Sequence, residues 1–169
     1  LYLNSTLVKS STTLANGGSL SGLISPVSND TDFSVIAKVN DGRTTVTKTN
    51  NFKFVRYGFY GTDSSSVACS SSDDVRALSN KLVNPKASNT FTVQANAGDT
   101  RITIAIPNSL TISSAKYVEG MGAESKDVFT KTIVNVEGNS NYSGIDYAVY
   151  SYIVPSPFTS TYTLEVTLG

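Results

Sequence analysis

The chain has 169 residues, and its 13 basic and 13 acidic side chains give a formal net charge of zero at neutral pH. It contains no histidine and one cysteine, which excludes imidazole-based catalytic triads, Cys–His dyads and zinc sites built from several His or Cys ligands. Because only 15% of the residues are charged and the two signs balance, we expect no binding to nucleic acid or to an anionic membrane surface. No apolar run approaches the ~18 residues of a membrane-spanning helix.

The composition of residues 1–30 predicts an extended arm. Residues 1–30 show no clear hydrophobic period, and Ser10–Gly22 is dominated by Ser, Thr, Gly and Asn. Such a segment buries little by itself, so an ordered form packs on something else. We therefore divide the chain into an extended arm or assembly segment, residues 1–30, and a β-sandwich domain, residues 31–169.

The next segment predicts three strands joined by turns. Phe33–Val39 is the first strand, and Asn40–Gly42 is a strong hairpin signal because Asn and Gly tolerate positive φ. Thr44–Thr49 is the expected return strand. Asn50–Asn51 is interpreted as a second turn, which makes Phe52–Tyr60 the third strand.

One short helix is expected, from Asp73 to about Lys81. Ser72 or Asp73 is the predicted cap, because a short polar side chain at that position accepts hydrogen bonds from free backbone N–H groups. Val75, Leu78 and Leu82 recur at the spacing of one apolar helix face.

The rest of the chain predicts strand after strand, separated by Gly, Asn and Pro turns. The expected strands are residues 90–94, 101–106, 112–118, 128–136, 145–154 and 162–168. Short strands at such regular spacing are typical of a sandwich or barrel. The predicted fold class is therefore all-β: an antiparallel β-sandwich with one short helix and an extended N-terminal arm.

Carboxylates are the acid–base groups that this histidine-free sequence offers for catalysis. Asp73 and Asp74 lie at the predicted start of the helix, where capping is the simpler role. Glu119, Glu124 and Asp127 flank a Gly-containing loop and would form a glycosidase pair only if the fold brought two of them within ~5–10 Å. Solvated loop acids are the simpler interpretation, so we expect no enzyme and no cofactor.

Two further features of the sequence are candidate sites. Asn29–Asp32 offers oxygen ligands at short spacing for Ca²⁺, but it lacks the glycine and the distal Glu of an EF-hand loop, so a turn is expected and no metal. Cys69 cannot form an internal disulfide, and no histidine is present to activate it as a nucleophile. A single unpaired cysteine fits assembly in a reducing cytoplasm.

Tyrosines gather in two stretches of the sequence. Tyr57 and Tyr60 belong to the first and Tyr142 and Tyr152 to the second. Exposed tyrosines stack on sugar rings or contact proteins, so these four are the candidate partner or glycan contacts. Core packing is the alternative, because neighbouring tyrosines of residues 145–154 point to both faces of the predicted strand.

From residue 57 onward the order of features resembles a known family. The features are Tyr57–Gly61, the helix Val75–Leu82, the run Arg101–Leu110 with its Pro107, then Phe129 with Thr132–Val136, Tyr147–Tyr150 before Pro155, and Tyr162–Val166. Residues 57–168 resemble a β-rich domain of structural proteins in tailed-bacteriophage particles, found in tail, baseplate and appendage components.

This resemblance implies a non-enzymatic virion protein of the tail, baseplate or neck region that acts through subunit assembly. The implied partners are other virion structural proteins and further copies of the chain, and the implied location is the virion, assembled in the host cytoplasm. The alternative is a receptor- or glycan-binding module of a tail fibre or a bacterial adhesin, with a host surface glycan as partner. A carboxylate glycosidase is the third hypothesis.

Overall fold

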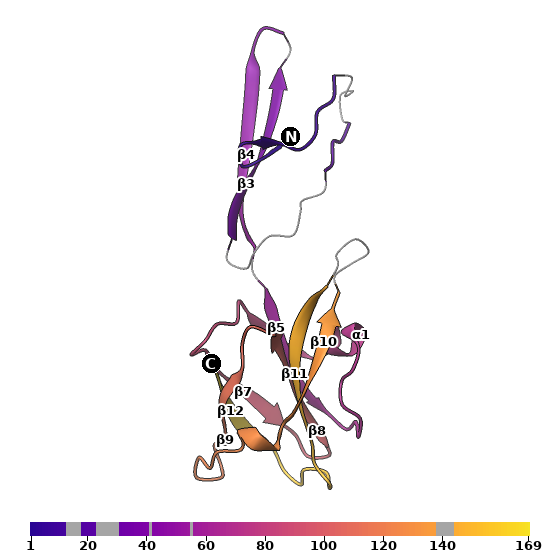
Figure 1. Ribbon diagram of the computed structural model, residues 1–169, viewed down its shortest axis with the longest axis vertical. Helices are drawn as coiled ribbons and strands as arrows, with labels where there is room; N and C mark the ends of the chain where they lie inside the picture. Colours follow the sequence, from indigo (N-terminus) through magenta and orange to yellow (C-terminus); the bar gives the residue numbers. More distant parts are fainter. Residues whose placement is uncertain (13–17, 23–30, 41, 55, 138–143) are drawn as a thin grey trace. The chain divides into compact units, whose positions relative to one another are not determined.

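The computed structural model describes residues 1–12, 18–22, 31–40, 42–54, 56–137 and 144–169 (Figure 1). The described strands pair in three sheets, every pairing is antiparallel, and one short α-helix is present. The predicted all-β class is thus confirmed. Contacts divide the chain into two compact units, Leu1–Arg56 and Tyr57–Gly169.

The first unit is a small sheet built on one long hairpin. Its strands are β1 (Tyr2–Leu3), β2 (Thr6–Leu7), β3 (Thr31–Asn40) and β4 (Thr45–Phe54), in the order β2-β1-β3-β4. Asn4 lies at φ 52° between β1 and β2, the left-handed conformation that a two-residue hairpin turn requires and that Asn tolerates.

Strand β4 runs through the predicted turn at Asn50–Asn51, so that prediction is wrong. Asn50 pairs with Val35 and Asn51 with Ser34 in the β3–β4 register. The continuous partner strand thus outweighs the local turn preference of the two asparagines. The predicted strand Phe52–Tyr60 is consequently divided: its first residues end β4, and β5 begins at Tyr57.

The second unit is a two-sheet sandwich. The larger sheet has the order β10-β11-β8-β5-β6 and the smaller one the order β7-β12-β9. The bounds are β5 (Tyr57–Asp63), β6 (Asn80–Val83), β7 (Thr90–Ala95), β8 (Arg101–Pro107), β9 (Ile112–Tyr117), β10 (Thr130–Val136), β11 (Ile145–Ile153) and β12 (Tyr162–Leu168), with α1 (Ser72–Arg76) and a 3₁₀ turn η1 (Lys126–Val128).

Strand β8 is buried on both faces because each face meets a different core cluster. Ile102, Ile104 and Ile106 point between the two sheets, where they pack with side chains of β7, β9 and β12. Ala105 points the other way, into a second cluster that α1 and the segment before it cover. The alternation of large and small residues along β8 therefore matches the space on its two sides.

Helix α1 is shorter than predicted, and its N-cap lies one residue before Ser72, the nearer of the two predicted caps. Ser71 is the N-cap: its hydroxyl accepts from the N–H of Asp74 at 3.1 Å, and the Asp74 carboxylate accepts from the N–H of Ser71 at 3.1 Å. The helix ends at Arg76, and Leu82, predicted on its apolar face, lies on β6 opposite Gly58. The pairing of β6 with β5 competes successfully with one further turn of helix.

The other predicted strands of this unit form close to their expected bounds, including those at residues 90–94, 101–106, 145–154 and 162–168. The range 128–136 is divided between η1 and β10. The sequence-based boundary lies at residues 30/31, whereas the contacts divide the chain at Arg56/Tyr57. Strands β3 and β4, which we expected in the sandwich, therefore belong to the first unit.

Candidate functional site

The first unit is notable for how little it buries. Every side chain whose burial is described within residues 1–56 is exposed or half-buried, whereas the buried hydrophobic side chains of the described chain begin at Cys69. Short sheets built around one hairpin are marginally stable in water unless something covers a hydrophobic face. Among its described residues, this unit is therefore a sheet without a buried core.

One face of the β3–β4 hairpin carries most of its apolar side chains, and we call it the hairpin face. Its members alternate along the two strands and pair across them: Phe33 with Phe52, Val35 with Asn50, Ala37 with Lys48, and Val39 with Val46. Val39 is 67% exposed, Val46 66% and Phe52 48%. The Phe33 and Phe52 rings stack with their centroids 5.6 Å apart.

Strand β4 is also an edge of its sheet. Its ten residues pair with β3 on one side, and within the described chain no strand pairs with the other side. Long exposed edges present rows of backbone N–H and C=O groups that accept an added strand. The hairpin thus offers a backbone edge and an apolar face to the same partner.

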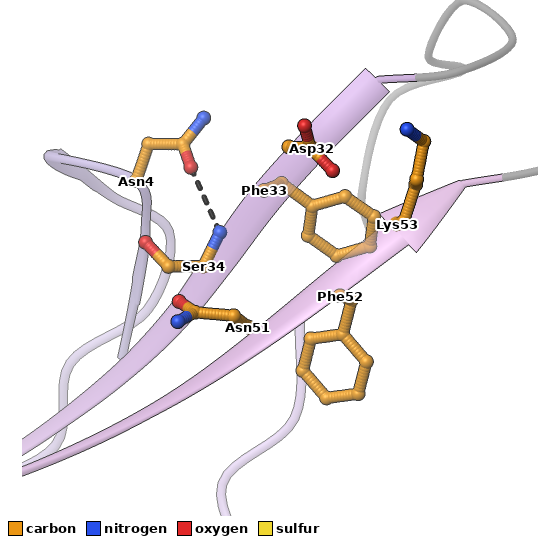
Figure 2. Close-up of a pocket in the computed structure, with 7 residues that line it drawn as sticks. All are labelled: Asn4, Asp32, Phe33, Ser34, Asn51, Phe52 and Lys53. Carbon is orange, nitrogen blue, oxygen red and sulfur yellow. Dashed lines mark hydrogen bonds between the residues drawn. The ribbon is translucent and has the colours of Figure 1, made fainter.

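The base of the hairpin is hollowed into an open pocket of about 560 Å³, whose lining Figure 2 shows. Asn4 reaches across from the β1–β2 turn, and its side-chain oxygen accepts from the N–H of Ser34 at 2.9 Å. The Phe33 and Phe52 rings line it together with the cross-strand pair Asp32 and Lys53. Asn4 therefore ties the β1–β2 turn to the hairpin.

Charge is distributed unevenly between the two units. Residues 1–56 contain six basic and three acidic side chains, and residues 57–169 contain seven basic and ten acidic ones. The neutral chain thus consists of a basic unit and an acidic unit. A basic unit of one copy and an acidic unit of another attract each other, and salt screens that attraction.

Of the four tyrosines expected to make partner or glycan contacts, the three that the structure describes do not meet at one site. Tyr57 is 40% exposed, with the Lys81 ammonium 5.7 Å from its ring centroid. Tyr60 is half-buried and packs on Phe91, at 4.9 Å between centroids. Tyr142 lies outside the described residues.

The fourth, Tyr152, lines an aromatic pocket at one end of the sandwich. Three further aromatic residues line the same pocket, and sequence reasoning did not single them out as contacts: Tyr117, Phe158 and Tyr162. They come from separate strands and a loop, so no local spacing marks them as a group.

Two of the candidate catalytic acids, Glu119 and Glu124, are held by backbone N–H groups. Both carboxylate oxygens of Glu119 accept from the N–H of Thr163, and Glu124 accepts from the N–H of Ala115 at 2.8 Å and from the hydroxyl of Ser114 at 2.7 Å. These hydrogen bonds lower the pKa of both carboxyls, that of Glu124 to about 2. A catalytic general acid needs the opposite shift. The bonds give the two glutamates a structural role in pinning the β9–η1 loop.

Cys69 is 1% exposed, and its Sγ lies 3.9 Å from the Thr103 hydroxyl. Burial raises the pKa of the thiol, so it stays protonated at neutral pH and lacks the thiolate character of a nucleophile. In the described ranges, no three Cys, Asp or Glu side chains gather closely enough to hold a metal ion. Residues 29 and 30 of the weighed calcium segment lie outside the described chain.

None of the described helices has the length and apolar character needed to cross a membrane. Comparisons of the chain with protein-family models, with curated proteins and with solved structures gave no match.

Proposed function

We propose that the chain is a non-enzymatic structural protein of a tailed-bacteriophage particle and that it acts through subunit assembly. The observation that carries the assembly role is the first unit, in which no described side chain is buried. A sheet of this kind gains its stability when a neighbour covers it. The choice of particle is supported by the resemblance of residues 57–168, a span that almost coincides with the compact unit Tyr57–Gly169.

The partner that fits best is a second copy of the chain. Its acidic unit complements the basic unit that carries the hairpin, and complementary charge speeds encounter and fixes orientation. A contact from the hairpin of one subunit to the sandwich of the next is heterologous, and such contacts propagate into rings or filaments. The β4 edge would add backbone hydrogen bonds to that contact.

The hairpin face supplies the apolar part of the contact. Covering Val39, Val46 and Phe52, which are between half and two-thirds exposed, contributes about 1–2 kcal/mol for each side chain. Aromatic side chains such as Phe52 are enriched at protein interfaces relative to the rest of the surface.

A pair of single substitutions on neighbouring residues of β4 tests this assignment. Val46 belongs to the hairpin face, whereas Thr47 points to the opposite face and pairs with Lys38. Val46→Asp and Thr47→Asp add the same charge to the same edge strand. We expect Val46→Asp to weaken self-association at least about tenfold, the equivalent of ~1.4 kcal/mol, and Thr47→Asp to weaken it much less.

Sedimentation velocity over a concentration series measures the strength of self-association of both variants and of the unsubstituted chain. Equal weakening by the two substitutions would point to a general charge effect and remove the hairpin face from the proposal. Association of all three proteins with the same strength would remove the hairpin altogether.

A further inference from the structure

The pocket that Tyr152 lines has a volume of about 440 Å³ and lies where strands β9, β11 and β12 of the sandwich meet. Tyr117 is the last residue of β9, Tyr152 lies near the end of β11, and Tyr162 is the first residue of β12. Phe158 reaches it from the loop between β11 and β12. Ser156 of the same loop adds a hydroxyl to the lining.

The aromatic walls are held in place by their packing. The Tyr162 ring stands at 78° to that of Tyr117, with centroids 6.2 Å apart, and lies 5.6 Å from that of Phe158. Backbone hydrogen bonds fix the loop: the N–H of Phe158 donates to Asp99 at 3.0 Å, and its C=O accepts from Gly98 at 2.8 Å. Rings fixed in this way present flat faces at little cost in side-chain entropy.

The tyrosines of these walls carry hydroxyl groups that can form hydrogen bonds with a ligand. Tyr117, Tyr152 and Tyr162 hydroxyls make no hydrogen bond to any other group in the part of the chain that the structure describes. Burial raises the pKa of Tyr117 to about 12, so this hydroxyl keeps its proton at neutral pH and can donate. A purely apolar occupant would bury these hydroxyls without partners, which is costly.

The charge in the pocket is negative. Glu119 is part of the lining, and the Thr163 N–H, 2.9 Å and 3.1 Å from its two oxygens, lowers the pKa of the carboxyl and keeps it ionised. The lining contains no Lys or Arg. An anionic ligand would therefore meet a like charge with no compensating cation.

We propose that this pocket binds a neutral pyranose sugar, a function beyond the assembly role. A pyranose has a flat C–H face that stacks on aromatic rings and an edge of hydroxyls that donate to a carboxylate and exchange hydrogen bonds with tyrosine hydroxyls. Both kinds of group occur together in the pocket. The ionised Glu119 selects neutral sugars against uronic acids and other acidic sugars.

Two-dimensional amide NMR of the full chain tests this with four probes: the methyl glycosides of glucose, galactose and mannose, and glucuronate. We expect at least one neutral glycoside to shift the amide signals around Tyr117, Tyr152 and Phe158 in a saturable way, with a Kd in the millimolar range. Glucuronate should leave these signals in place. If none of the three neutral glycosides shifts them, the proposal is wrong.

Matched variants locate the binding. Tyr152→Phe keeps the ring and removes the hydroxyl, so it should weaken binding about fivefold, the equivalent of one net hydrogen bond. Tyr150→Phe is the control, because Tyr150 lies two residues earlier on the same face of β11 and does not line the pocket. Phe158→Ala should abolish binding. Because Phe158→Ala also removes the packing of the loop on Tyr162, Tyr152→Phe provides a test that preserves the loop.

A substitution of Glu119 tests the selection against acidic sugars. Glu119→Gln keeps an oxygen that can accept from the Thr163 N–H and removes the negative charge, so it should admit glucuronate. Unchanged binding in Tyr152→Phe and Phe158→Ala would place the sugar elsewhere and overturn the proposal. Binding of glucuronate by the unsubstituted chain as tightly as a neutral glycoside would overturn the selectivity.

Discussion

Deleting residues 1–56 should leave the β-sandwich folded and almost unchanged in stability. All the buried hydrophobic side chains of the described chain, from Cys69 to Leu168, lie in the remaining part. We therefore expect the free energy of unfolding to change by less than about 1 kcal/mol, below the ~2–5 kcal/mol cost of truncating one large core side chain. The m-value should also stay nearly constant, because it follows the surface that unfolding exposes.

A core substitution provides the scale for this measurement. Ile104 is fully buried between the sheets, so Ile104→Ala in the truncated chain should cost about 2–5 kcal/mol. Urea unfolding followed by circular dichroism and by tyrosine fluorescence measures both changes. A non-cooperative transition of residues 57–169, or a loss as large as that of Ile104→Ala, would refute the reasoning, because the first unit would then supply essential packing.

Three further predictions concern the sandwich itself. A Cβ at Gly61 would lie 2.8 Å from the Ser79 hydroxyl and 3.2 Å from its backbone nitrogen, so Gly61→Ala should destabilise the fold by about 1–3 kcal/mol in urea unfolding. Cys69 is buried and its thiol pKa is raised, so a thiol reagent should label it only after unfolding. The pKa of Glu124 is lowered from 4.5 to about 2, so its stabilising contribution should be complete above pH 4.5 and disappear as the pH falls towards 2.

Each of these three predictions would be contradicted by a specific result. A Gly61→Ala midpoint equal to that of the unsubstituted chain would mean that Ser79 moves away freely. Rapid labelling of Cys69 in native buffer would mean that the covering segment opens. A Glu124→Gln variant that loses stability over the same acid range as the unsubstituted chain would assign that loss to other carboxyls.

The sandwich strands could be predicted because their signals are local. Arg101–Pro107 alternates and then stops at proline, and this segment is the central strand β8. The errors arose where a distant partner decides the local structure. Asn50 and Asn51 are strong turn formers, yet β3 holds them in a strand, and Leu82 has helical spacing, yet it pairs in β6 with β5.

The candidate sites were harder to predict for the same reason. The alternating apolar residues of the hairpin were visible in the sequence, but alternation does not say whether a face is covered by another sheet or left exposed. The walls of the aromatic pocket come from β9, β11, β12 and a loop, and only Tyr152 was among the expected contacts. Such a grouping depends on strand order, which no local pattern contains.

The assembly role is tested most directly by comparing the association state of the full chain with that of residues 57–169 by sedimentation velocity at equal concentrations. We expect the full chain to form concentration-dependent oligomers, which weaken as salt is raised, and the truncated chain to stay monomeric. Monomers in both cases, or the same oligomer in both, would contradict the assignment of assembly to the first unit.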